Sequence, residues 1–168
     1  MKLLIGALCC CLVLVSCVEP STTSQTLKTF VPATAPRKVA IWMDSDGRSY
    51  TSKYDGIENK VREILIREIV EKGWEIVPSM NSADYGLVYV YGIKSSEHAG
   101  YSVYGNSIME DRMYMFYTKA ELSKVGSDHR PKETVWNGSA FLGQYNADLE
   151  RIFPTMAKSL IENEFPHR

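Results

Sequence analysis

The cysteines are the residues whose chemistry is easiest to specify. A cysteine thiolate is a strong nucleophile and can carry a covalent group. Cys17 follows Ser16 and the branched residues Leu14 and Val15, and a small residue before a cut is typical of an export signal. If the chain is cut there, it keeps one thiol and has no disulfide option. The four cysteines all lie within the first 17 positions, at Cys9, Cys10, Cys11 and Cys17.

The N-terminal segment has the form of an export leader. Met1-Lys2 gives a short positive start, and the run Leu3–Val15 is free of charge. This run is shorter than the roughly 20 apolar residues that span a bilayer, so we predict a signal peptide over 1–16. Leu14-Val15-Ser16-Cys17 resembles a bacterial lipobox. The resemblance implies cleavage between Ser16 and Cys17, with attachment of diacylglycerol to the Cys17 thiol and usually of an amide-linked acyl chain such as palmitate.

This resemblance also predicts where the protein resides. Two or three acyl chains anchor a protein to a membrane without any transmembrane helix. In enterobacterial sorting, an Asp after the lipidated cysteine retains a lipoprotein at the inner membrane, whereas this chain has Val18. We therefore expect a lipid-anchored protein of the cell envelope, at the outer membrane and facing the periplasm.

Composition divides the remaining chain in two. Residues 17–37 are rich in Pro, Thr and Ser, which predicts a lipidated N-terminus followed by a flexible tether. Residues 38–168 have the length and apolar content of one folded domain. The net charge of the chain is −1, and no block of like charge stands out, so nothing in the charge argues for nucleic acid or for a polybasic membrane patch.

The order of expected elements predicts an α+β fold. We expect a mostly antiparallel sheet of four to five strands, with two main helices packed on one face. Ile66 and Val70 lie off the apolar stripe of the first helix, which predicts a second neighbour for it. Pro154 predicts a kink or a late start in the second helix. Strands are expected near 38–43, 74–77, 85–93, 112–125 and 133–145, helices near 55–72 and 148–165, and a long loop over 94–111.

Short motifs in the domain resemble a family of small, uncharacterised envelope lipoproteins. The family pattern includes a Trp-x-Gly-x-Ala strand, matched here by Trp136-Asn137-Gly138-Ser139-Ala140, and a helix ending in Phe-Pro, matched by Phe165-Pro166. Lys72-Gly73-Trp74 and Ser82-Ala83-Asp84-Tyr85, before a Val-rich strand, also fit. The likeness covers roughly residues 38–166 and implies a compartment and a fold more than an activity.

Other polar motifs do not reach the requirements of a catalytic or metal site. Asp44-Ser45-Asp46-Gly47 lacks the further ligands and the terminal Glu of a calcium loop. Ser127-Asp128-His129 has triad residue types, but consecutive residues cannot form a triad. Glu110-Asp111 could supply paired carboxylates, although their distance to a partner carboxylate is not fixed by sequence. We predict no catalytic residue, metal or cofactor; His98, His129 and His167 have no ligand spacing.

Tyrosine is concentrated in the middle of the chain, where seven of the ten lie between Tyr85 and Tyr117. Tyr89 and Tyr91 share a strand face with Leu87, which favours packing on the sheet. Tyr101 and Tyr104 lie in the long 94–111 segment, and we predict them as a candidate binding surface, because tyrosine suits interfaces and such loops are often functional.

These observations favour a non-enzymatic binding or assembly module of the envelope. Its expected contacts are the membrane, through the N-terminal lipid, and an envelope protein or polymer of unknown identity. One alternative is a periplasmic hydrolase with acidic residues at its centre. Another is a subunit of an envelope assembly that is ordered by pairing of edge strands.

Overall fold

Two helices and eight strands make up the described part of the chain in a computed structural model, which describes residues 19–28, 35–45, 51–95, 100–104, 107–111, 114–144 and 148–167. The side chains within residues 45, 51–55, 95, 100–104 and 107–111 are not described. The elements are β1 (Ser21–Thr26), β2 (Lys38–Ser45), α1 (Thr51–Glu71), β3 (Glu75–Ile76), the 3₁₀ turn η1 (Met80–Ser82), β4 (Tyr85–Ser95), β5 (Gly100–Tyr104), β6 (Ser107–Asp111), β7 (Tyr114–Val125), β8 (Pro131–Gln144) and α2 (Leu149–Glu164).

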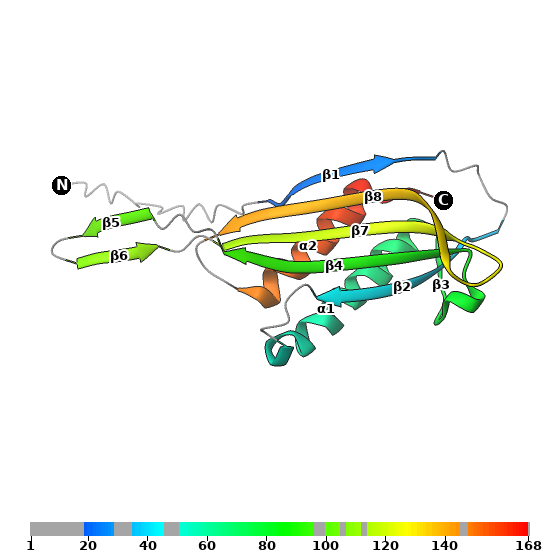
Figure 1. Cartoon of the computed structure of the whole chain (residues 1–168), viewed down its shortest axis with the longest axis horizontal. Helices are drawn as coiled ribbons and strands as arrows, with labels where there is room; N and C mark the ends of the chain where they lie inside the picture. Colours follow the sequence, from blue (N-terminus) through cyan, green and yellow to red (C-terminus); the bar gives the residue numbers. More distant parts are fainter. Residues whose placement is uncertain are drawn as a thin grey trace, which may run out of the picture.

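The main sheet has six strands in the order β1-β8-β7-β4-β2-β3 (Figure 1). Neighbours are antiparallel from β1 to β4, whereas β2 is parallel to both β4 and β3. The parallel pairs arise because α1 carries the chain back after β2, as a crossover between parallel strands requires. The α+β prediction is confirmed, but the sheet has more strands than the four to five expected.

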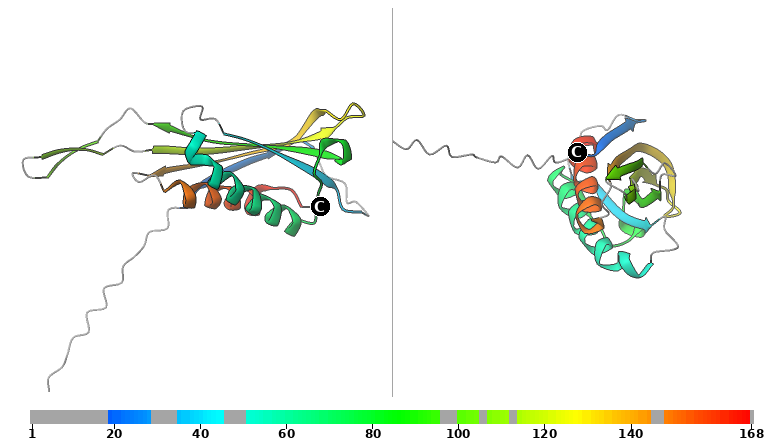
Figure 2. Two further views of the ribbon diagram at one scale, coloured as in Figure 1. Left: turned by 90° about the horizontal axis from the view of Figure 1, so that it is seen from below. Right: turned by 90° about the vertical axis from the view of Figure 1, so that its left-hand side faces the viewer.

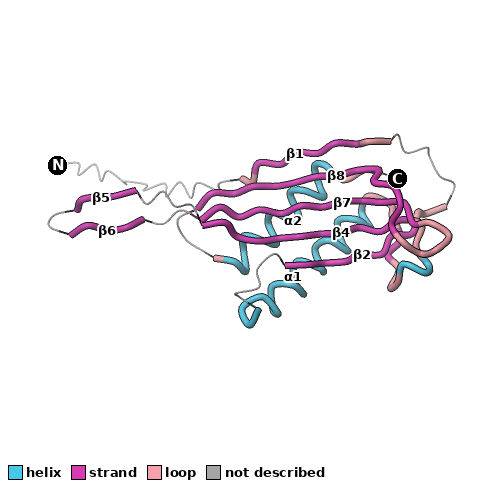
Figure 3. Tube along the Cα trace, in the orientation of Figure 1, coloured by secondary structure: helices cyan, strands magenta, loops and turns pink. Residues whose placement is uncertain are grey.

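Both helices pack on one face of this sheet and leave the other face open (Figures 2 and 3). A stripe of α1 that includes Val61, Leu65 and Ile69 is fully buried, as the apolar periodicity predicts. Ile66 and Val70 do not meet a second neighbour; they are 37% and 51% exposed. These two residues therefore form part of the solvent-facing side of α1.

Aromatic side chains fill the core beneath the helices. Phe153 of α2 packs edge-on against Tyr91, with ring centres 4.9 Å apart, and against Phe116 at 5.9 Å. Phe165, just after α2, contacts Trp136 of the predicted Trp-x-Gly-x-Ala strand at 5.2 Å. Edge-to-face pairs of this kind add about 0.5–1.5 kcal/mol each beyond area burial. The C-terminal helix is thus joined to β4, β7 and β8 through rings.

The structure departs from the predicted tether over 17–37. Pro20 is buried, and Ser21–Thr26 form β1, which pairs antiparallel with β8 along its whole length. Glu164, at the end of α2, accepts hydrogen bonds from the hydroxyls of Thr22 at 3.1 Å and Ser24 at 2.6 Å. A strand of Ser, Thr and Gln therefore stays on the sheet through main-chain pairing and a distant carboxylate, rather than through apolar burial.

Two further expectations are corrected. The predicted loop over 94–111 contains the end of β4 and a two-stranded antiparallel ribbon, β5–β6. Of the kink or late start that Pro154 predicts in the second helix, the late start is wrong, because the helix runs continuously from Leu149 to Glu164. Pro154 has no N–H to donate within the helix. The hydroxyl of the next residue, Thr155, donates to the Arg151 carbonyl at 2.8 Å, so it does not replace the bond to the Glu150 carbonyl that Pro154 cannot make.

Candidate functional site

The open sheet face is the largest feature of the described residues that the core does not use. Strand alternation sends one set of side chains under the helices and the other set outward. In one row across the sheet, Trp42 lies opposite Val88, Val88 opposite Glu121, and Glu121 opposite Asn137. Adjacent rows contain Val90, Lys119 and Ser139, and then Tyr117 and Phe141.

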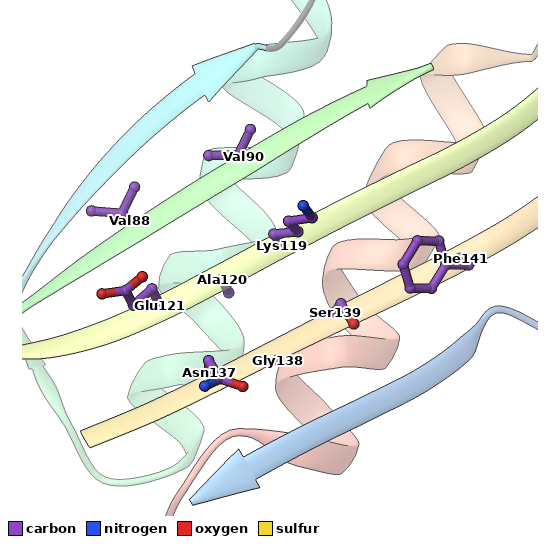
Figure 4. A pocket seen from close by; sticks show the side chains of 9 residues that line it. All are labelled: Val88, Val90, Lys119, Ala120, Glu121, Asn137, Gly138, Ser139 and Phe141. Carbon is purple, nitrogen blue, oxygen red and sulfur yellow. The ribbon is translucent and has the colours of Figure 1, made fainter. Parts of the chain in front are cut away.

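A shallow depression of about 480 Å³ lies on this face over β4, β7 and β8 (Figure 4). Its lining combines apolar surface from Val88, Val90 and Phe141 with the charged groups of Lys119 and Glu121 (Figure 4). Asn137 and Ser139 add amide and hydroxyl groups. Such a mixture suits recognition of another chain or polymer, with an apolar contact area and a few polar groups that fix orientation.

The polar groups in the depression are already engaged with neighbours. The Glu121 carboxylate accepts hydrogen bonds from the hydroxyls of Ser123 and Thr134. The Ser139 hydroxyl is 3.0 Å from that of Thr23 in β1. A serine nucleophile needs a base that takes its proton, and a threonine hydroxyl cannot do this. The contact with Thr23 therefore does not activate Ser139 as a nucleophile.

One end of the open face combines aromatic rings with cations. The Tyr117 ring lies across Gly92, where an added Cβ would come within 2.6 Å of the Tyr117 hydroxyl oxygen, so this close approach requires glycine. The ammonium groups of Lys94 and Lys119 stand 5.4 Å and 6.0 Å from the ring centre, within cation–π range. Phe141, opposite Tyr117, is 43% exposed.

On the side of the sheet formed by β2 and β3, the outer edge of β2 is only partly covered. β3 pairs with β2 only at Lys38 and Val39, so no described strand covers the outer edge of β2 from Ala40 onward. Trp42 lies in this segment and is 64% exposed. An uncovered strand edge exposes main-chain groups that can pair with another chain. Trp42 adds the largest exposed aromatic surface among the described residues.

The structure tests few of the site residues predicted from sequence. Ser16 and Cys17 lie outside the described residues. Tyr101 and Tyr104 belong to β5, with backbone partners Glu110 and Ser107, but their side chains are outside the described set. The binding-surface prediction for this pair therefore stays a prediction.

Other tyrosines and polar motifs are placed more fully. Tyr89 and Tyr91 are buried core residues, as their strand face predicts. Burial raises the pKa of the Tyr89 hydroxyl, and the neighbouring Thr118 hydroxyl opposes this to a smaller extent. Among the described residues, the hydroxyls of Tyr89 and Thr118 make no hydrogen bond of regular geometry. His129 sits in the β7–β8 turn with a φ of 58°.

Two searches of the described residues concern metals and membranes. No group of three or more His, Cys, Asp or Glu side chains in this part of the chain is placed to hold a metal ion. Neither described helix is both long enough and apolar enough to cross a bilayer.

Sequence reasoning did not single out Trp42 and Phe141. The signal was present in part, because Trp42 alternates with Val39, Ile41 and Met43 along β2. Alternation places the indole on the other face from those three, but it does not say which face the helices cover.

Comparison with known proteins places the fold. No family model matches the sequence, and no curated protein matches it either. The chain is similar to the PelC dodecamer from Paraburkholderia phytofirmans, with a TM-score of 0.52, 12% identity, and coverage of 89% of this chain and 100% of that one. A PDZ domain protein from Parabacteroides distasonis matches with a TM-score of 0.54 at 9% identity, over 89% of this chain but only 37% of that one.

Bacterial lipoproteins also occur among the similar structures. A lipoprotein from Neisseria meningitidis matches with a TM-score of 0.36 and 14% identity, over 70% of this chain and 92% of that one. At these identities, the matches with TM-scores above 0.5 show a shared fold.

Proposed function

We propose that this protein is a lipid-anchored lipoprotein of the bacterial envelope that acts without catalysis, as an assembly module that binds further copies of itself. The observation that carries the proposal is the uncovered β2 edge with Trp42, which is 64% exposed on the helix-free face. An indole of this exposure is a typical anchor of a protein interface. PelC, which shares the fold over its whole length, forms a dodecamer.

Anchoring and compartment form the second part of the proposal. The lipobox-like Leu14-Val15-Ser16-Cys17 supports cleavage before Cys17 and acylation of its thiol. Val18 favours the outer membrane. The domain would then face the periplasm, where copies anchored in one membrane meet at raised local concentration and in a common orientation.

The polar groups of the depression support binding rather than hydrolysis. A periplasmic hydrolase would need an activated nucleophile or an available carboxylate. Ser139 already has a hydrogen-bond partner in Thr23 of β1, and Glu121 accepts from Ser123 of its own strand and from Thr134 of β8.

Assembly can be tested on the purified, lipidated protein in detergent by native mass spectrometry and light scattering. We expect the wild type to form a species larger than a monomer, and Trp42→Lys to return it to the monomer without lowering the midpoint of thermal unfolding. Val70→Lys is the matched control, because it places the same charge on an exposed apolar site of α1.

A monomeric wild type in detergent and in crosslinked intact cells would overturn self-assembly, as would a Trp42→Lys variant that assembles like the wild type. For the anchor, Cys17→Ser should abolish labelling with palmitate. Labelling that persists in this variant would contradict lipidation at Cys17.

A further inference from the structure

The distance between the membrane anchor and the folded domain is short. Pro20 is buried, and Ser21 begins β1 opposite Phe141. Only Val18 and Glu19 separate Cys17 from Pro20, and three extended Cα–Cα steps of about 3.6 Å span about 11 Å at most. This reasoning rests on the proposed lipidation of Cys17. An acylated Cys17 then keeps the start of β1 close to the polar headgroup layer of the bilayer.

This constraint selects one end of the sheet. β1 starts at the end where β4 and β8 finish and where β7 begins, because Ser21 pairs near the end of β8 and Ser95 pairs with Tyr114. The β5–β6 ribbon extends from this same end (Figures 1 and 2). The β7–β8 turn lies at the other end, roughly 40 Å away along β8 at about 3.3 Å per residue.

The chemistry of the selected end matches a lipid headgroup layer. Phe141 is 43% exposed there, beside the Tyr117 ring. Lys94 lies at this end, opposite Met115, whereas Lys119 lies at the middle of β7, opposite Val90. Both lysines are exposed, and their ammonium groups flank the Tyr117 ring. The Tyr117 ring is itself buried, so Phe141 is the ring that can reach a membrane, and phenylalanine on membrane-surface segments inserts at the boundary between headgroups and acyl chains. Lysines near the surface attract anionic phospholipids while their alkyl chains cover apolar surface.

We infer that the protein docks on its own membrane through this end of the open sheet face, with Phe141 at headgroup level and Lys94 and Lys119 on anionic phosphates. The ligand is the surface of an anionic phospholipid bilayer. The β7–β8 turn points into the aqueous compartment, and Trp42, on the far margin of the sheet, stays available to a neighbouring copy.

The cysteine content allows a direct test with the lipidated full chain. Once the Cys17 sulfur is a thioether, an introduced cysteine is the only reactive thiol in the mature protein. Gly143 is exposed on the open face two residues after Phe141, and Ser127 is exposed in the β7–β8 turn. We would label Gly143→Cys and Ser127→Cys with a polarity-sensitive fluorophore and reconstitute each into vesicles containing phosphatidylglycerol.

We expect a blue-shifted emission, quenched by headgroup-attached quenchers, from position 143 and an aqueous spectrum from position 127. The double variant Lys94→Gln/Lys119→Gln should lower the docked-to-undocked ratio about 30-fold, since each lysine near an anionic surface contributes about one kcal/mol. The matched control, Lys124→Gln/Lys132→Gln, removes two exposed lysines at the other end and should leave the ratio unchanged.

Two outcomes would overturn the docking, and they differ in meaning. In the first outcome the protein is lipidated, but the fluorophore at position 143 gives an aqueous spectrum or is no closer to lipid than the one at position 127. This result contradicts the docked orientation and leaves the proposed lipid anchor intact. An intact mass without acyl chains on Cys17 contradicts the proposed function itself and removes the distance constraint together with the docking.

Discussion

Replacing Glu164 by Ala should release β1 from the sheet without unfolding the domain. The carboxylate accepts hydrogen bonds from Thr22 and Ser24, at 3.1 Å and 2.6 Å, and β1 has no buried apolar side chain of its own. Hydrogen bonds to a charged acceptor contribute about 1.5–3 kcal/mol each when shielded. Because the groups at this edge are partly exposed, we expect about 1–2 kcal/mol for the pair together.

The assay is native-state hydrogen exchange of the peptide over residues 19–28, read by mass spectrometry. An opening free energy lowered by about 1.4 kcal/mol speeds exchange of the β1 amides about tenfold, while the core strands keep their protection. Glu162→Ala is the matched control, because its carboxylate is an exposed partner of Lys158 at 3.9 Å and faces no β1 hydroxyl. Unchanged exchange of β1 in Glu164→Ala would refute the reasoning, and so would equal acceleration in both variants.

Three further substitutions test burial and packing. In urea unfolding, the free energy of unfolding of Tyr89→Phe should equal that of the wild type or exceed it by up to about 1 kcal/mol. The substitution removes a buried hydroxyl that has no regular hydrogen bond within the described residues. Burial raises the pKa of Tyr89 in the folded state, so above about pH 10 the tyrosine ionises in the unfolded chain but not in the folded one. The free energy of unfolding of the wild type should therefore fall by about 1.4 kcal/mol per pH unit, and Tyr89→Phe should escape this loss. Parallel alkaline profiles of the two proteins would contradict this. Gly138→Ala should lower the free energy of unfolding by about 1–3 kcal/mol, since its Cβ would lie 2.6 Å from the buried Trp136 ring. Gly56→Ala has open space around it in α1 and should raise the free energy of unfolding by about 0.5–1 kcal/mol. Equal unfolding midpoints for the two variants would count against the packing described.

The parts of the fold that the sequence predicts are those whose signal is local. In α1, Val61, Leu65 and Ile69 recur at helical spacing, and β7 and β8 alternate apolar and polar residues around a polar turn. Their burial therefore follows from period and length alone. The parallel pairing of β2 with β4 is not local, because it depends on where α1 returns the chain.

β1 shows why other parts could not be predicted. Its sequence, Ser-Thr-Thr-Ser-Gln-Thr, has the composition of a linker, although the β-branched threonines suit a strand. What makes it a strand is an open edge of β8 and the Glu164 carboxylate, which is 142 positions from Thr22. No window of the sequence contains both partners.

The candidate site divides in the same way. The lipobox-like motif at Leu14–Cys17 is contiguous, so sequence reasoning could propose it, and it stays a prediction. The face that contains Trp42 and Phe141 is assembled from strands far apart in the chain. The helices decide which side of each strand faces solvent, and the sequence pattern alone does not say which side they cover.

The pairing of β1 with β8 also sets the order in which the domain can fold. Ser21 and Phe141 are 120 positions apart, and β1 lacks the apolar side chains that would let it collapse early. Contacts of such separation form late, since the entropy of closing the long loop is lost before the contacts compensate for it. During folding, the sheet edge at β8 therefore stays unpaired until β1 returns to it. In that interval the β8 edge, like the uncovered edge of β2, exposes main-chain groups that can pair with the wrong chain.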